Sequence, residues 1–115
     1  MKKEVMVVAL GGNALIDKRV GKDIRAQHRV INKAIQNISF LFNKFNVAIV
    51  HGNGFQIGEL LLQNEIARGK VPVSSLDVLD AETQGELGYL IEQSIINELQ
   101  SHKINKSVVT FLTQV

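Results

Sequence analysis

Two short apolar runs, each followed by a glycine-rich turn, organise the pattern of this sequence. The runs Val5–Leu10 and Val47–Val50 are rich in β-branched residues and too short for buried helices, which predicts buried parallel strands. The first leads into Gly11-Gly12-Asn13, and the second leads into His51-Gly52-Asn53-Gly54. A third apolar run predicts a third strand over Ser107–Thr113.

The stretches between these runs predict helices. Apolar residues recur every three or four positions over about Ile24–Phe45, which predicts one amphipathic helix. A second helix is expected from the second glycine turn to Ala67 or Arg68, with Gly69 as its C-cap. A third, longer helix is expected over Leu76–Leu99.

This order of strands and helices predicts an α/β fold, because right-handed crossovers would place the strands in a parallel sheet. Gly85 and Gly88 lie inside the longest predicted helix, where each costs up to about 1 kcal/mol relative to alanine. Close packing of that helix on another helix or on a second subunit is one reason for such glycines.

Composition narrows the class of protein. The 115 residues, 45% of them hydrophobic and 21% charged, predict one folded domain. The net charge of +2 is spread along the chain, which argues against nucleic-acid binding. The absence of cysteine excludes disulfides and thiolate chemistry, and three histidines at unrelated spacings predict no metal site. No run approaches the ~20 apolar residues of a membrane span, and no cleavable leader is apparent, so we expect a cytoplasmic protein.

The two glycine turns are the candidate site. In a parallel sheet, ligands bind beyond the carboxyl ends of the strands, and glycine lets the backbone approach an anion closely. The helix N-termini that follow would add partial positive charge, and Asn13 and Asn53 would add amide donors. Neither turn is a Walker loop or a dinucleotide fingerprint. The alternative is that both are simply tight turns. The predicted anion-binding residues are Gly11, Gly12, Asn13, His51, Gly52, Asn53 and Gly54.

Four blocks of the sequence together resemble carbamate kinase, a member of the amino-acid-kinase superfamily. They are Val7–Leu15, Val50–Gly58, Leu76–Gln93 and Val108–Val115. The resemblance implies a three-layer αβα sandwich with a mainly parallel sheet. It also implies the reaction ATP + carbamate = ADP + carbamoyl phosphate, with Mg²⁺, in arginine degradation by the deiminase pathway. The seven turn residues would then bind carbamate or carbamoyl phosphate. A homodimer would form through the helix at 76–99, which would account for Gly85 and Gly88.

The chain departs from the family at two positions and in length. Phe55 stands where the family usually has proline, and Asp80 stands where it tends to have a small uncharged residue. Carbamate kinases are much longer than residues 1–115, and their C-terminal half carries the nucleotide site. We therefore expect a truncated, carbamate-binding and dimerising part that is inactive by itself. We also expect an exposed apolar sheet face.

Two alternatives remain open from the sequence. One is another enzyme of the superfamily, such as an acetylglutamate or glutamate kinase. The blocks at His51–Gly54 and Ala81–Gly85 argue against it. The other is a non-catalytic remnant that dimerises or binds anions. The DNA sequence beyond codon 115 would distinguish such a remnant from one part of an active kinase.

Overall fold

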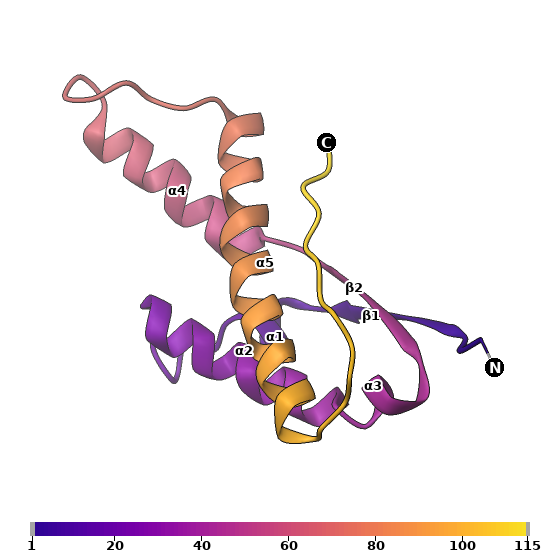
Figure 1. Ribbon diagram of the computed structural model, residues 1–115. Helices are drawn as coiled ribbons and strands as arrows, with labels where there is room; N and C mark the ends of the chain where they lie inside the picture. Colours follow the sequence, from indigo (N-terminus) through magenta and orange to yellow (C-terminus); the bar gives the residue numbers. More distant parts are fainter. Residues whose placement is uncertain (1, 115) are drawn as a thin grey trace.

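The chain folds into a two-stranded parallel sheet with helices of very different lengths. The computed structural model describes residues 2–114 (Figure 1). Its elements, in chain order, are β1 (Val5–Leu10), α1 (Gly12–Leu15), α2 (Ile24–Ile38), α3 (Leu41–Lys44), β2 (Asn46–His51), α4 (Gly54–Ala67) and α5 (Leu76–Ser101).

The sheet is covered on one face. The two strands pair in parallel with Val8 opposite Ile49 and Leu10 opposite His51, and this face packs against the helices. The alternate positions of β1 point the other way, where Val5 is 70% exposed and Val7 is 63% exposed. The α/β class, the parallel sheet and the exposed apolar face are therefore confirmed. The prediction of fully buried strands is wrong for the second face, because no described helix covers it.

The core lies between the covered face of the sheet, α2 and α5. Asp23 starts α2 by accepting a hydrogen bond from the Ala26 N–H at 2.8 Å, which satisfies one of the free N–H groups of the first turn. Ile31 and Ile35 then point from α2 into the core with no exposed surface, as does Leu87 from α5.

The single helix predicted over Ile24–Phe45 is wrong, because the chain breaks into α2 and α3 at Ser39. The Ser39 hydroxyl donates to the carbonyl oxygen of Gln36 at 2.9 Å, and the Ser39 N–H donates to the same oxygen at 3.2 Å. A serine that bonds back to its own helix competes with the regular backbone ladder. The apolar spacing continues across this break, so periodicity alone did not reveal it.

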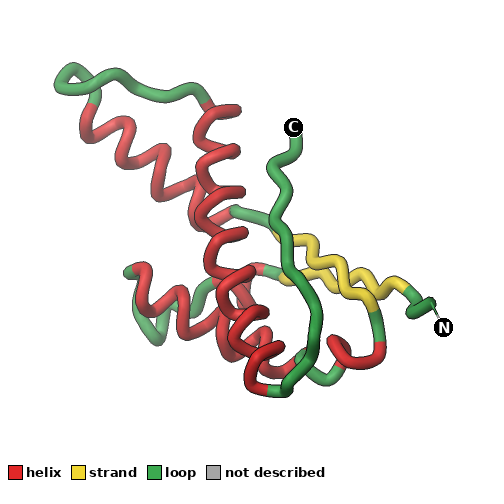
Figure 2. The backbone as a smooth tube through the Cα atoms, in the orientation of Figure 1, coloured by secondary structure: helices red, strands yellow, loops and turns green. Residues whose placement is uncertain are grey.

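The helices α4 and α5 confirm the predicted spans to within two residues. The helix α4, the loop after it and the start of α5 extend away from the core, to which the rest of α5 belongs (Figure 2). Gly69, just beyond the end of α4, has φ +83°, a conformation that favours glycine at a helix C-terminus. Gln56 is the only buried residue of α4. The radius of gyration is 15.9 Å, against about 13 Å for a compact domain of this length.

The predicted third strand is wrong. Residues 104–114 form extended chain that runs beside α5 without pairing with β2 (Figure 1). The side chain of Gln84 takes the place of a neighbouring strand. Its Oε1 accepts from the Thr113 N–H at 2.8 Å, and its Nε2 donates to the Thr113 carbonyl at 3.1 Å. A helix side chain thus satisfies backbone groups that a β-ladder would otherwise use.

The same segment explains Gly88. A Cβ at this position would lie 2.3 Å from Thr110 Cγ2, so the extended chain rather than another helix requires the glycine. Gly85 differs, because a Cβ there would meet no atom within 4 Å. No helix within residues 2–114 combines the length and apolar character that crossing a membrane requires.

Candidate anion-binding site

The fold brings the two glycine turns together. Leu10 and His51 are partners in the sheet register, so the turns that follow them leave neighbouring strand ends. Between the turns lies a small pocket of about 170 Å³. It is lined by Leu10, Gly11, Gly12, Leu15 and Ile16 from the first turn and by Gly52, Asn53, Gly54, Phe55 and Gln56 from the second.

The glycines leave the backbone of this pocket open. A Cβ added to Gly11, Gly12, Gly52 or Gly54 would meet no atom within 4 Å. Packing within the described chain therefore does not require glycine at these positions, whereas close approach of a ligand to the backbone would. The first N–H groups of α4 have no carbonyl partner within the helix, and the helix dipole makes this end favourable to negative charge.

Asn53 does not offer the amide donor that the sequence predicted. Its Nδ2 donates to Oδ1 of Asp80 at 2.6 Å and to Oγ1 of Thr83 at 2.8 Å. Both of these residues belong to α5, and together they engage both amide hydrogens. Asn53 is the N-cap of α4, but its side chain makes no capping hydrogen bond. It lines the pocket as a residue that ties the turn to α5. Asp80, the departure from the family pattern, is part of that tie.

Asn13 and His51 lie outside the lining of the small pocket. Asn13 is exposed on α1. The Nδ1 of His51 lies 3.0 Å from the carbonyl oxygen of Gly52. Because a carbonyl oxygen only accepts, this contact places the hydrogen on Nδ1 and leaves Nε2 without it in the neutral ring. Anion binding by the seven predicted residues therefore stays a prediction, with five of them at the pocket.

A larger groove of about 870 Å³ lies on the other side of the second turn, between β2, α5 and the extended segment 106–113. His51, Gly52 and Asn53 line one part of it. Lys106 also lines it and donates to the carbonyl oxygen of Phe45. Burial lowers the pKa of Lys106, and the positive charge of Lys3 lowers it further. The groove occupies the side of β2 where a further strand would pair.

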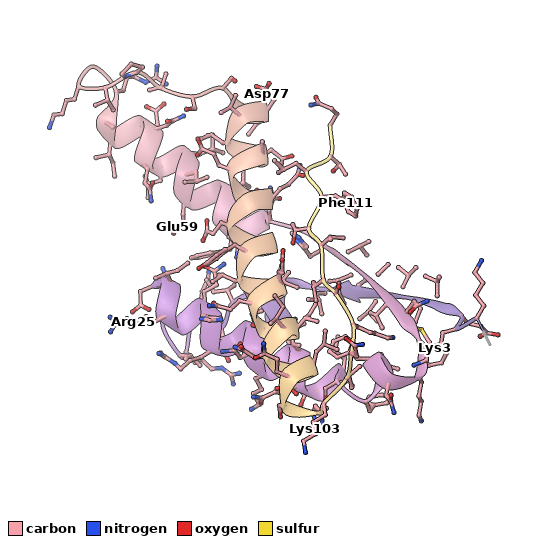
Figure 3. The ribbon with its side chains drawn as sticks, viewed as in Figure 1. Lys3, Arg25, Glu59, Asp77, Lys103 and Phe111 are labelled. Carbon is pink, nitrogen blue, oxygen red and sulfur yellow. The ribbon has the colours of Figure 1, made fainter. Side chains whose placement is uncertain are left out.

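Among residues 2–114, no charged side chain lines the small pocket between the turns. Figure 3 shows the labelled Glu59 on α4 and Asp77 at the start of α5. Backbone groups and amides, rather than cationic side chains, are therefore the means by which the described residues would hold an anion at this pocket.

Comparisons with known proteins agree with this architecture. No family model matches the chain. It is 36% identical over 113 residues to the carbamate kinase of Thermococcus kodakarensis, covering 95% of this chain and 36% of that protein. It is 41% identical over 112 residues to the carbamate kinase of Escherichia coli K12, covering 97% of this chain and 36% of that one. The solved carbamate kinase of Giardia lamblia bound to AMP-PNP superposes with a TM-score of 0.81 at 32% identity, covering 93% of this chain and 37% of that chain.

The parallel sheet with a glycine turn after each strand defines an α/β protein. The superposition on a solved carbamate kinase makes this fold amino-acid-kinase-like. The matches are more specific than the fold, since they extend over nearly all of this chain. Over the segment that it spans, the chain is homologous to the corresponding part of carbamate kinases. It spans about a third of the length of the curated relatives that it matches.

Sequence reasoning missed Gln56 as a residue of the site. Gln56 is 4% exposed and lines the pocket between the turns. Its place directly after the second glycine turn, in the third position of α4, was visible in the sequence. Its burial was not, because burial depends on contacts between residues far apart in the chain.

Proposed function

We propose that this chain provides the carbamate-binding part of a carbamate kinase, ATP + carbamate = ADP + carbamoyl phosphate. The observation that carries the proposal is the pocket of about 170 Å³ between the two glycine turns. Its backbone is open to a ligand at four glycines. The helix dipole of α4 would stabilise an anion bound at the N-terminus of that helix. Relatives named carbamate kinase that match over this segment support the choice of substrate.

The work of such a pocket is positioning and charge stabilisation. Transfer of a phosphoryl group asks little covalent chemistry of the protein, so backbone N–H groups aimed at the anion suit the reaction. In this proposal the turns hold carbamate or carbamoyl phosphate, and ATP or ADP with Mg²⁺ binds to a part of the enzyme beyond the two turns. The AMP-PNP bound to the Giardia lamblia enzyme supports nucleotide use in the family.

The proposal extends to the setting of the reaction. It includes a role in arginine degradation by the deiminase pathway, a cytoplasmic location and a homodimer formed through α5. The exposed Leu76, Val78 and Tyr89 of α5, which are 61%, 45% and 67% exposed, support a second copy as the partner of this helix. The open space around Gly85 is compatible with close approach of that copy.

Titration of the 115-residue chain with carbamoyl phosphate and with ATP tests the proposal. We expect carbamoyl phosphate to bind and to raise the melting temperature, because a ligand that binds only the folded state stabilises it. We expect ATP alone to give no heat of binding at concentrations that saturate ordinary kinases. Calorimetric binding of ATP in that range would contradict the proposal that the nucleotide binds elsewhere in the enzyme. Failure of carbamoyl phosphate to bind would contradict the proposed function itself.

Replacement of Asp80 by alanine is expected to strengthen carbamoyl phosphate binding. The substitution removes a carboxylate that bonds to Asn53 at 2.6 Å, next to the anion pocket. Loss of one negative charge at this range raises affinity for an anion by about two- to fivefold. The loss of the charged hydrogen bond costs about 1.5–3 kcal/mol of stability, which chemical denaturation measures.

Asp77→Ala is the matched control for this prediction. Asp77 is exposed, lies on the same helix and carries the same charge, and it makes no hydrogen bond with Asn53. Its removal is expected to leave the dissociation constant of carbamoyl phosphate unchanged within about twofold. Equal effects of the two variants, or weaker binding in Asp80→Ala, would show that Asp80 does not act through local charge.

A further inference from the structure

We infer that Gln56 is a further binding residue of this site, whose side-chain Nε2 donates a hydrogen bond to an anionic oxygen of the bound substrate. The inference rests on the proposed function, since it assigns a side-chain donor to the pocket proposed for carbamate or carbamoyl phosphate. Gln56 is the third residue of α4 and one of the residues that line that pocket.

The side chain of Gln56 is buried without a partner for its amide. The residue is 4% exposed, and its Nε2 has no hydrogen-bond partner among residues 2–114. Buried amides in folded proteins are nearly always hydrogen-bonded, because an unpaired one has lost its water and received nothing in exchange. A donor left open at the wall of a pocket is therefore a donor kept for a ligand.

The start of α4 does not use this donor. A glutamine at the third helical position commonly bonds back to the N-cap residue, but it does so through its oxygen, which leaves both amide hydrogens free. The N-cap side chain, Asn53, is directed to Asp80 and Thr83 instead. The Nε2 of Gln56 and the first N–H groups of α4 thus remain as donors at one end of one helix.

The surroundings specify the ligand as a small anion. The volume of about 170 Å³ suits a small ligand, the glycines leave the backbone open to it, and the N-terminus of α4 presents N–H donors. Within residues 2–114, the amide Nε2 of Gln27 and the ring Nε2 of His28 are also buried without a hydrogen-bond partner. Both residues lie on α2, and neither lines this pocket. Of these three residues, only Gln56 both has an unpaired buried donor and lines the pocket.

Variants of Gln56 test the inference in the 115-residue chain. Gln56→Met removes the amide at nearly constant length, and Gln56→Glu keeps the shape but replaces the donor with a carboxylate. Gln63→Met is the matched control, because Gln63 is an exposed glutamine of the same helix. Melting curves and calorimetric titrations are recorded with carbamoyl phosphate, with inorganic phosphate and with bicarbonate, which has the planar shape of carbamate.

We expect Gln56→Met to melt at the wild-type temperature or above it without ligand, since no hydrogen bond of the free protein is lost. Its affinity for carbamoyl phosphate is expected to fall by about tenfold or more, the usual effect of one hydrogen bond to a charged group. Gln56→Glu is expected to lose at least as much, and Gln63→Met nothing. A selective loss of bicarbonate binding assigns Gln56 to the carbamoyl end, and a selective loss of phosphate binding assigns it to the phosphoryl end.

Two results overturn the inference, and they are distinguishable from failure of the proposed function. Wild-type affinity in Gln56→Met or Gln56→Glu, while the wild type binds carbamoyl phosphate, removes Gln56 from the site and leaves the proposed function standing. A melting temperature that falls by several degrees in both ligand-free variants assigns the amide a structural role instead. Absence of any carbamoyl phosphate binding by the wild type overturns the proposed function and, with it, the inference.

Discussion

Replacement of Ile31 by alanine is expected to lower the free energy of unfolding by about 2–5 kcal/mol, which is enough to unfold much of the chain. Ile31 lies on α2 with no exposed surface and belongs to the core that joins α2 to α5. Alanine would remove three carbon atoms and leave a cavity that the surrounding helices fill only in part. Loss of this contact would also release α5, which holds Asn53 through Asp80 and Thr83.

Ile24→Ala is the control for the cavity, since Ile24 begins the same helix and is 53% exposed. We expect this substitution to change stability by no more than about 0.5 kcal/mol. Urea denaturation followed by circular dichroism measures both variants against the wild type. Similar losses in the two variants would contradict the packing of α2 on α5.

Replacement of Gly88 by alanine is expected to destabilise the chain by about 1–3 kcal/mol, whereas replacement of Gly85 is expected to stabilise it by about 0.5–1 kcal/mol. The two glycines lie one turn apart in α5 and differ only in their surroundings. A Cβ at Gly88 would lie 2.3 Å from Thr110 Cγ2, and a Cβ at Gly85 would meet no atom within 4 Å. The alanine at 88 would push the extended segment away from the helix.

A double variant separates this clash from other effects of alanine. Thr110→Ser removes the methyl group that approaches Gly88 and keeps the hydroxyl that donates to Glu92 at 2.6 Å. We expect Gly88→Ala to recover most of its lost stability in the Thr110→Ser background. Chemical denaturation at a concentration where the chain is monomeric measures all four variants. No recovery in the double variant would contradict the contact.

A concentration series with Gly85→Ala adds information on the proposed homodimer. In the monomer the extra methyl group faces open space and improves helix propensity. In a dimer formed through α5, the same methyl group would lie at the interface and weaken association. A stabilised monomer with a raised dimer dissociation constant is therefore the combination that the proposed dimer requires.

Several features of this protein were determined by local sequence. Each strand is a short β-branched run followed by a glycine turn, so the parallel sheet and the placement of Gly11-Gly12 beside His51–Gly54 could be predicted. The span of α4 followed from the glycine turn before it and from the glycine at position 69, and that of α5 from the connector that ends before Leu76. The strands, turns and helix spans depend on residues close together in the chain, which is the information that periodicity and turn chemistry contain. The parallel pairing of the distant strands followed from the right-handed crossover rule.

The remaining features were decided by tertiary contacts between residues far apart in the chain. The run Ser107–Thr113 has the composition of a strand, but Gln84 and Gly88 of α5 hold it as extended chain beside the helix. The side-chain amide of Asn53 is held by Asp80 and Thr83 of α5, which lie about thirty residues further along the chain.

The candidate site shows the same division. Its glycine turns could be predicted from the sequence, because a strand end and a flexible backbone are local properties. The burial of Gln56 depends on contacts between distant segments, since the pocket that it lines joins residues 10–16 to residues 52–56. Hydrogen-bond satisfaction and burial depend on which distant groups the fold brings together, so only the tertiary structure assigned Asn53 to α5 and left Gln56 facing the pocket.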